Sequence, residues 1–449
     1  MNPFPLPTPL ITPPRQLHRA VGLSFGIAVT IGGTVGAGIL RTPGTIASYL
    51  GRTDLIVFAW LIVGVIAALG ANCYAELATA MPTAGGPFVF VRRGLGGFAG
   101  FAAACADWLA QLCAFAYVAT ALGEYSADAL SLAQGHTEAI ALALLLAITA
   151  LNWFGVRVGA TFQQWMSAAK ALGLIVLAGA FLVWGKASSG SAEVSPHAPT
   201  TLLQFAAAML FAIRAITENY SGWNGVVYFS EDQREPSNNI PRSLFWGVLS
   251  IVVLYMLINI ALLSALPMAT LASSKLAVAD AAQAVFGQSS GRIVTLVSIV
   301  SLLGILNVTA MGAPRILLGL SRTALMPVGV GRLNQAGSPG IAMLVTTAAA
   351  SVLVSTSSFD KLFGMAGFLQ IALDTSVYLS FFRLRRIEPT LRRPYLARGY
   401  PLLPALPLLV SALLLAGLAI NDPASSGYTV LLVALSYPLY ALLKRPRRE

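Results

Sequence analysis

The chain has 449 residues, of which 57% are apolar and 10% are charged. Soluble domains carry about 25% charged residues, so this balance excludes a soluble globular protein and indicates a polytopic all-α membrane protein. The formal net charge of +11 does not indicate a nucleic-acid partner, because the basic residues are spread over short segments between apolar runs.

About twelve apolar runs are each long enough to cross the bilayer core, which takes roughly 20 helical residues. The proline-rich segment before them lacks the apolar core and cleavage site of a signal peptide, so residues 1–20 are expected to be a cytoplasmic tail. The three cysteines lie within runs and lack metal-ligand spacing, so we expect no metal or other cofactor. The runs begin near Val21, Leu55, Gly97, Ile140, Phe162, Leu202, Leu244, Ile293, Ile341, Leu362, Leu402 and Tyr428.

The first and sixth predicted spans are interrupted. The first contains Gly32-Gly33-Thr34-Val35-Gly36-Ala37-Gly38, and the sixth contains Asn219-Tyr220-Ser221-Gly222-Trp223-Asn224. Gly32 and Gly36 also form a GxxxG packing pair, but four glycines in seven residues exceed what packing requires. Irregular backbone at bilayer depth persists only where it is buried in protein or lines a cavity. Both interruptions therefore predict a binding site, as in secondary transporters.

The interruptions open two blocks of five spans, residues 21–185 and 200–386, which are followed by two further spans in residues 400–443 and a cytoplasmic tail, 444–449. Because five is odd, the second block must have the opposite orientation in the membrane. This arrangement predicts a 5+5 inverted repeat with the site between the repeats.

The basic residues divide unequally between the two sides of the membrane. With a cytoplasmic N-terminus, twenty of the 28 lysines and arginines lie on the cytoplasmic side, six on the other, and Lys170 and Arg214 within spans. Since short cytoplasmic loops are rich in Lys and Arg, this asymmetry predicts cytoplasmic termini and an even number of spans. We expect a multi-pass protein of the bacterial plasma membrane.

The two interruptions offer complementary chemistry. A break in the first helix would leave free amides near residues 36–38, at the positive end of a half-helix, which suits a carboxylate. A break in the sixth would leave free carbonyls near Glu218 and Ser221, which attract an ammonium group. Together they describe the backbone of a free amino acid. Tyr220 and Trp223 are at mid-span and are expected to line the cavity.

Four groups of motifs identify a family resemblance. They are Ile31–Pro43; Tyr74-Ala75-Glu76-Leu77 with Met81–Pro87; Gly222-Trp223-Asn224 with Phe229–Asp232 and Pro236–Arg242; and Asn307 with Pro314-Arg315 and Leu325-Met326-Pro327. These motifs resemble the first, second, sixth and eighth helices of the amino acid/polyamine/organocation superfamily and, within it, the L-amino acid transporter-like permeases. The resemblance implies a leucine-transporter fold with discontinuous helices 1 and 6, twelve spans, and amino acid transport by alternating access.

The resemblance also implies roles for single residues. The substrate carboxylate would bind at Thr34, Ala37 and Gly38, and the amino group at the carbonyls of Gly33, Glu218 and Ser221, with Gly222 and Trp223 beside them. The segment Ser167–Lys170 is similar to the fifth-helix TxxK of the family, whose lysine occupies the sodium position in sodium-independent members. A second tier of candidates comprises Tyr220, Asn224, Asn307, Asp374 and Arg214.

Lys170 also stands out without the resemblance. It lies about nine residues into its span, roughly 14 Å at 1.5 Å per residue. A lysine at that depth is costly and usually functional. It could change protonation during transport, or its ammonium group could hold the first helix break against the eighth helix near Ser301. The alternative without a functional role is that the side chain snorkels to the membrane interface.

Glu218 departs from the family pattern, which has a gating aromatic residue at that position. Arg214 precedes it by one turn, and such a pair can neutralise itself. Otherwise Glu218 would face the substrate and favour a second positive charge, as in a cationic amino acid or a diamine.

Other carboxylates lie within spans or at their ends. Asp374 is an intramembrane functional candidate or a hydrogen-bonded helix contact. Asp107 is interpreted as structural, and Glu76, Glu231 and Asp232, with arginines near them in the sequence, as salt bridges of a gate or of loops.

We therefore expect a sodium-independent permease of amino acids, working as a proton symporter or an exchanger. The alternative is a transporter of diamines or cationic amino acids. An enzyme is not expected, because the histidines lie only in the tail and loops and no catalytic constellation is present. The expected partners are a small-molecule substrate and the lipid bilayer, without an obligatory protein subunit.

Overall fold

The computed structural model describes residues 17, 19–36, 38–185, 201–287, 290–421 and 423–444. Within these ranges the regular secondary structure is entirely helical. The predicted site residue Ala37 lies outside the described residues. The α-helices are α1 Leu23–Thr34, α2 Gly38–Leu50, α3 Thr53–Ala80, α4 Phe88–Leu95, α5 Gly97–Ala129, α6 Thr137–Trp153, α7 Val156–Trp184, α8 Leu202–Tyr220, α9 Pro236–Ala265, α10 Met268–Ser273, α11 Ala277–Phe286, α12 Gly291–Arg322, α13 Gly340–Thr356, α14 Phe359–Ile387, α15 Leu402–Asn421 and α16 Pro423–Lys444; the 3₁₀-helices are η1 Gln134–His136, η2 Trp223–Phe229 and η4 Val328–Gly331.

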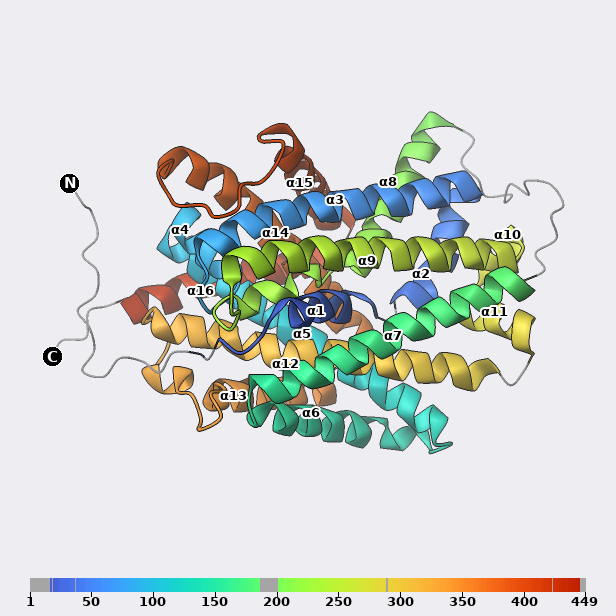
Figure 1. Cartoon of the computed structure of the whole chain (residues 1–449), viewed down its shortest axis with the longest axis horizontal. Coiled ribbons are helices and arrows are strands. Elements are labelled where there is room, and N and C mark those ends of the chain that lie inside the picture. Colours follow the sequence, from blue (N-terminus) through green and yellow to red (C-terminus); the bar gives the residue numbers. More distant parts are fainter. Residues whose placement is uncertain are drawn as a thin grey trace.

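The long helices run side by side along the long axis of the molecule (Figure 1). By length and composition, seven helices in the described ranges could cross a bilayer, or eight if α1 and α2 form one broken span. The all-helical membrane class predicted from composition is therefore confirmed, whereas the count of twelve spans and the inverted repeat stay predictions. Each of the twelve predicted runs contains a helix, but α6 and α13 have only 17 residues each.

Several predicted starts coincide with helix starts, and the differences have a local cause. The starts near Gly97, Leu202 and Leu402 are those of α5, α8 and α15. By contrast, α9 begins at Pro236, about two turns before the predicted Leu244. Its first turns contain polar residues, so hydropathy alone does not detect them.

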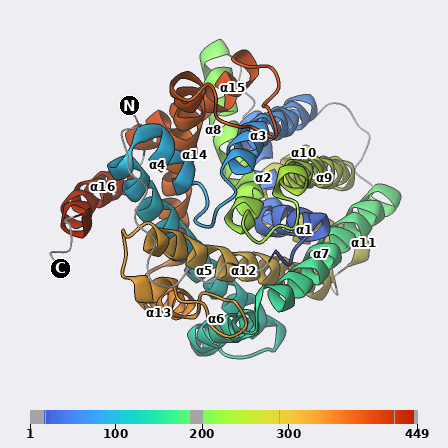
Figure 2. The same cartoon turned by 60° about the vertical axis from the view of Figure 1, so that its left-hand side comes forward.

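The helices that surround the centre form two sets. The α9 group consists of α1, α3, α9 and η2, in which both α9 and η2 contact α1, α3 and each other. The α5 group consists of α5 with α12 and α14 packed against it. Figure 2 shows α1, α3 and α9 together on one side and α5 and α12 on the other. Helix α7 contacts α1, α9 and α12 and so joins the two sets.

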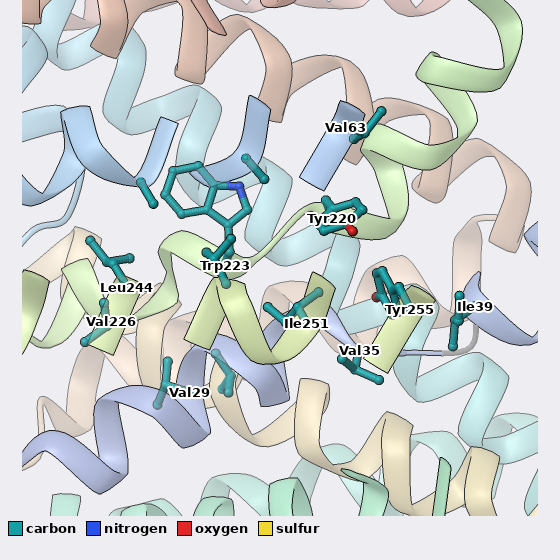
Figure 3. Close-up of a cluster of buried hydrophobic side chains, with 14 of the residues drawn as sticks. Val29, Val35, Ile39, Val63, Tyr220, Trp223, Val226, Leu244, Ile251 and Tyr255 are labelled. Carbon is teal, nitrogen blue, oxygen red and sulfur yellow. The ribbon is translucent and has the colours of Figure 1, made fainter. Parts of the chain in front are cut away.

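Both predicted interruptions are breaks in the structure. The helix axis bends by 50° between α1 and α2, where Val35 has an extended conformation. Helix α8 ends at Tyr220, and after Ser221 and Gly222 the chain continues as the 3₁₀-helix η2. Figure 3 shows this connection as a thin loop between Tyr220 and Trp223.

Ion pairs cluster at one end of the bundle, here called the arginine-rich end, where α4 and α9 begin and α12 and α14 end. Glu76, Glu231 and Asp232 form ion pairs there, as expected. Their partners are arginines far away in the sequence, however, and not the arginines close to them in the chain. Asp232 Oδ2 accepts from Arg315 Nε at 2.9 Å, and this pair is almost fully buried. The remaining pairs there include Glu231 with Arg322, and Glu76 with both Arg385 and Arg393.

Candidate functional site

The two helix breaks touch each other through glycine. A Cβ atom added to Gly222 would lie 2.4 Å from the carbonyl oxygen of Gly33, and one on Gly33 would lie 3.1 Å from that of Gly222. Gly222 also has φ +98°, a conformation that L side chains rarely adopt. Only glycine therefore allows the backbone of one break to approach the other this closely.

Tyr255 on α9 connects the two breaks. Its hydroxyl lies 2.8 Å from the carbonyl oxygen of Asn219 and 3.2 Å from that of Thr34. These carbonyls are at helix C-terminal ends, where no intrahelical donor remains. The Tyr255 ring packs edge-on against Tyr220 with centroids 5.1 Å apart, as the labelled side chains in Figure 3 show. The buried hydroxyl thus ties both C-terminal ends to one helix.

Lys170 supports the first break from the opposite side. Its buried Nζ donates to the carbonyl oxygens of Gly32 at 3.0 Å, Val35 at 2.7 Å and Ser301 at 2.9 Å. Two of these acceptors belong to the break and the third to α12. The ammonium therefore joins the α1 break to α12 through main-chain acceptors.

A row of polar side chains continues from Lys170 along α7. Ser167 Oγ donates to the carbonyl oxygen of Ala28 at 2.7 Å, and Gln163 Oε1 accepts from Asn307 Nδ2 at 2.9 Å. Asn307 Oδ1 accepts in turn from Asn152 Nδ2 at 2.8 Å. Asn307, a second-tier candidate, thus joins α12 to α6 and α7 and does not line the central cavities described next.

A cavity of about 110 Å³ lies between the breaks and the α5 group. From the breaks it is lined by Gly33, Glu218, Ser221, Gly222 and Asn224. A cavity that holds one water molecule needs only about 10–15 Å³, so there is room for a small solute. The other polar and aromatic lining residues are Tyr228, which lies in η2 after the second break, and, on the wall opposite the breaks, Gln111, Tyr117, Thr309, Phe363 and Gln370.

A smaller cavity of about 60 Å³ adjoins the larger one and extends toward α3 and α15. The two share four lining residues, Ser221, Gly222, Asn224 and Gln370. The second-tier candidates Tyr220 and Asp374 line the smaller cavity, as does Trp223. The break in the sixth span thus forms part of the wall of both cavities.

The predicted carboxylate-binding residues lie at the edge of this arrangement. Thr34 and Gly38 line neither of the two cavities, and Thr34 Oγ1 donates to the carbonyl oxygen of Thr30 at 2.9 Å. A Cβ on Gly38 would lie 2.3 Å from Asn219 Oδ1, so α2 also contacts the second break closely. The first amides of α2 have no acceptor within their own helix.

Glu218 both lines the larger cavity and faces Arg214. The distance from Arg214 Nε to Glu218 Oε1 is 3.8 Å, and the two side chains are 35% and 26% exposed. That separation is too long for a hydrogen bond and is typical of a weak, solvated ion pair. Arg214 does not line either cavity.

Two aspartates accept hydrogen bonds from tyrosines near the cavities. Asp107 Oδ1 on α5 accepts from the hydroxyl of Tyr228 at 2.7 Å, and Asp374 Oδ1 on α14 accepts from that of Tyr74. No sequence pattern singled out Tyr228, Gln111, Tyr117 and Thr309 as lining residues. Gln111 follows Asp107 by one turn, and such a polar pair within an apolar span was a signal that could have identified this wall.

Comparison with known proteins identifies the family. The sequence model of the family described as amino acid permease matches residues 22–442, most of the chain. The chain belongs to the amino acid permease family. The predicted membership of the amino acid/polyamine/organocation superfamily is thereby confirmed, and so is the expectation of a multi-pass membrane transporter rather than an enzyme.

Relatives of this permease extend over nearly its whole length. It is similar to the serine/threonine exchanger SteT of Bacillus subtilis, with 26% identity over 97% of this chain and 99% of that protein. It is also similar to large neutral amino acids transporter small subunit 2 of Rattus norvegicus, with 26% identity over 95% of this chain and 81% of the relative. Human Asc-type amino acid transporter 1 is 25% identical over 95% of this chain and 82% of that protein.

Proposed function

We propose that this permease moves amino acids by alternating access, without sodium, as an exchanger or a proton-coupled transporter. The observation that carries the proposal is the backbone contact between two helix breaks at the wall of a cavity, with a buried ammonium group beside them. The names of the relatives, which are exchangers and transporters of amino acids, favour the same class of substrate.

The proposed substrate binds through its main-chain groups. Its ammonium group lies against the carbonyls of Gly33, Glu218 and Ser221, all of which line the larger cavity. Its carboxylate is bound at Thr34, the last residue of α1, and at Ala37 and Gly38, near the start of α2, where the helix dipole favours an anion. Gly222 lines the same cavity and Trp223 the smaller cavity beside it, and the substrate side chain extends toward α5 and α14.

Sodium independence is proposed because of Lys170. Its ammonium group already binds two carbonyls of the first break and one of α12, so a sodium ion would meet a positive charge and occupied ligands. Replacing external sodium by choline should leave uptake unchanged. A requirement for sodium would refute this part of the proposal.

Glu218 supports a second candidate, a transporter of cationic amino acids or diamines. Its carboxylate lines the larger cavity, and the 3.8 Å separation leaves it only weakly neutralised by Arg214. A substrate with a second positive charge would then gain an ion pair in the cavity.

Counterflow in proteoliposomes tests the function and separates the two candidates. Vesicles are loaded with an unlabelled neutral amino acid, cationic amino acid or diamine, and entry of the matching labelled compound is followed. Uptake of neutral amino acids alone means that Arg214 neutralises Glu218. Uptake of cationic compounds that is lost in Glu218→Gln, but kept in the surface control Glu138→Gln, means that Glu218 binds the second charge. No counterflow with any of them would refute the proposed function.

We also propose that the two five-span blocks, residues 21–185 and 200–386, form the inverted repeat, and that both termini lie in the cytoplasm of a bacterial cell. An impermeant thiol reagent added to intact cells should then label Lys275→Cys but not Arg332→Cys. The protein is proposed to work without an obligatory subunit, so the purified chain alone should support counterflow.

A further inference from the structure

We propose that Asp107 and Asp374 together form the proton-binding site of this transporter. The inference rests on the proposed function in its proton-coupled form. It assigns the coupling proton to a pair of carboxyl groups beside the cavities, on two helices that belong to the α5 group.

The two aspartates have matching positions. Each lies one helical turn from a glutamine that lines the larger cavity: Asp107 from Gln111 on α5, and Asp374 from Gln370 on α14. In both cases the aspartate is the residue nearer the arginine-rich end. Because α5 packs against α14 and both glutamines line one cavity, the two carboxyl groups lie on neighbouring helices beside the same cavity.

Neither aspartate forms an ion pair within the described part of the chain. Asp107 is fully buried, and its Oδ2 has no hydrogen-bond partner. Both hydrogen bonds of Asp374, from Tyr74 and from Gln370, reach Oδ1, and the residue lines the smaller cavity. Intramembrane carboxyl groups without a cationic partner are typical of proton sites.

The groups that face the pair are neutral in their ordinary state. Tyr74 comes from α3, Tyr228 from η2, and Tyr378 from α14. Toward the arginine-rich end, Arg385 and Arg393 are both bound by Glu76, and Arg315 on α12 is bound by Asp232. Two neighbouring carboxylates without a cationic partner repel each other in a medium of low dielectric constant. Binding one proton relieves this repulsion.

The hydrogen bonds of the pair explain how a bound proton acts on transport. The donors Tyr74 and Tyr228 belong to the α9 group, whereas the acceptors belong to the α5 group. A tyrosine binds an ionised carboxylate more strongly than a neutral carboxylic acid. Protonation therefore weakens the bonds that join the two groups of helices and favours their relative movement.

The same tyrosines are coupled to the substrate site. Trp223, in the sixth-span break, packs edge-on against Tyr74 with ring centroids 5.0 Å apart. Tyr228 lines the larger cavity and also accepts from Gln111 Nε2 at 3.2 Å. A substrate that moves the break thus changes the surroundings of both carboxyl groups.

The test compares two transport modes in the same proteoliposomes. Counterflow at equal pH inside and outside needs no proton gradient, whereas accumulation driven by an alkaline lumen does. We expect Asp107→Asn, at a residue that lines neither cavity, to keep counterflow and to reduce pH-driven accumulation to the level of protein-free liposomes. Asp374→Asn should reduce pH-driven accumulation more strongly than it reduces counterflow. Asp54→Asn, an exposed aspartate paired with Arg52 at the start of α3, should change neither.

Tyr74→Phe and Tyr228→Phe supply a second readout that keeps both carboxyl groups. Each should shift the pH at which accumulation is half-maximal, because the aspartate that accepts from that tyrosine loses a hydrogen-bond donor. Accumulation at the wild-type level in both Asn variants would overturn the inference, as would loss of counterflow in a folded Asp107→Asn protein. If the wild type shows counterflow but no response to a pH gradient, the proton site is refuted while the proposed function stands. If the wild type shows no counterflow, the proposed function itself fails.

Discussion

Replacing Lys170 by methionine tests the support of the first helix break most directly. Methionine keeps most of the side-chain length but removes the ammonium group, so three buried carbonyls, those of Gly32, Val35 and Ser301, lose their donor. The acceptors stay in place, and an unsatisfied buried carbonyl is costly.

The expected loss follows from the number of bonds. Hydrogen bonds between membrane helices contribute about 0.6 kcal/mol on average and up to about 1.7 kcal/mol. A charged donor roughly doubles the average value, so three bonds amount to about 4 kcal/mol. Because the ammonium group no longer has to be desolvated, part of this loss is offset, and we expect a net destabilisation of about 2 kcal/mol.

Two measurements check this prediction. Fluorescence-detected size-exclusion chromatography after heating should show a lower apparent melting temperature for Lys170→Met, and counterflow should fall because the break is no longer fixed. Lys275→Met, an exposed position on the opposite side of the bundle from the arginine-rich end, is the matched control. If Lys170→Met melts and transports like the wild type, the ammonium group does not support the break and the reasoning is wrong.

Three further variants probe other contacts of the site and the end of the bundle. Gly222→Ala should cost about 1–3 kcal/mol from backbone strain alone, and its Cβ would also clash with the carbonyl oxygen of Gly33 at 2.4 Å. This variant should abolish folded expression. The control Gly179→Ala, whose Cβ meets no atom within 4 Å, should express normally. Tyr255→Phe should keep the fold but weaken substrate affinity in a binding assay, because the two breaks lose their common donor; unchanged affinity would show that the hydroxyl does not order them. Asp232→Asn should destabilise the protein by about 3–5 kcal/mol, because it leaves the buried charge of Arg315 uncompensated. Adding Arg315→Gln to this variant should recover part of the melting temperature. If it does not, the uncompensated charge is not the cause of the loss.

Local sequence determined a large part of this architecture. Runs of apolar residues predicted where helices lie, and the glycine-rich and polar interruptions predicted the breaks, because both depend on properties of neighbouring residues. The depth of Lys170 in its span followed from counting residues along the helix. The family motifs, also short and contiguous, correctly indicated an amino acid permease.

The tertiary structure alone decided which residues meet. Tyr228 donates to Asp107 from 121 positions away, and Tyr74 to Asp374 from 300 positions away, so no local pattern connects them. The sequence placed Asp374 within a span but left open whether it was a functional group or a helix contact, and it favoured a structural role for Asp107. Which face of a helix packs against which neighbour depends on contacts summed over the whole bundle. Hydropathy and local breaks therefore determined the helices and the positions of the two interruptions, whereas packing determined the cavities beside them, their hydrogen bonds and the pairing of charges.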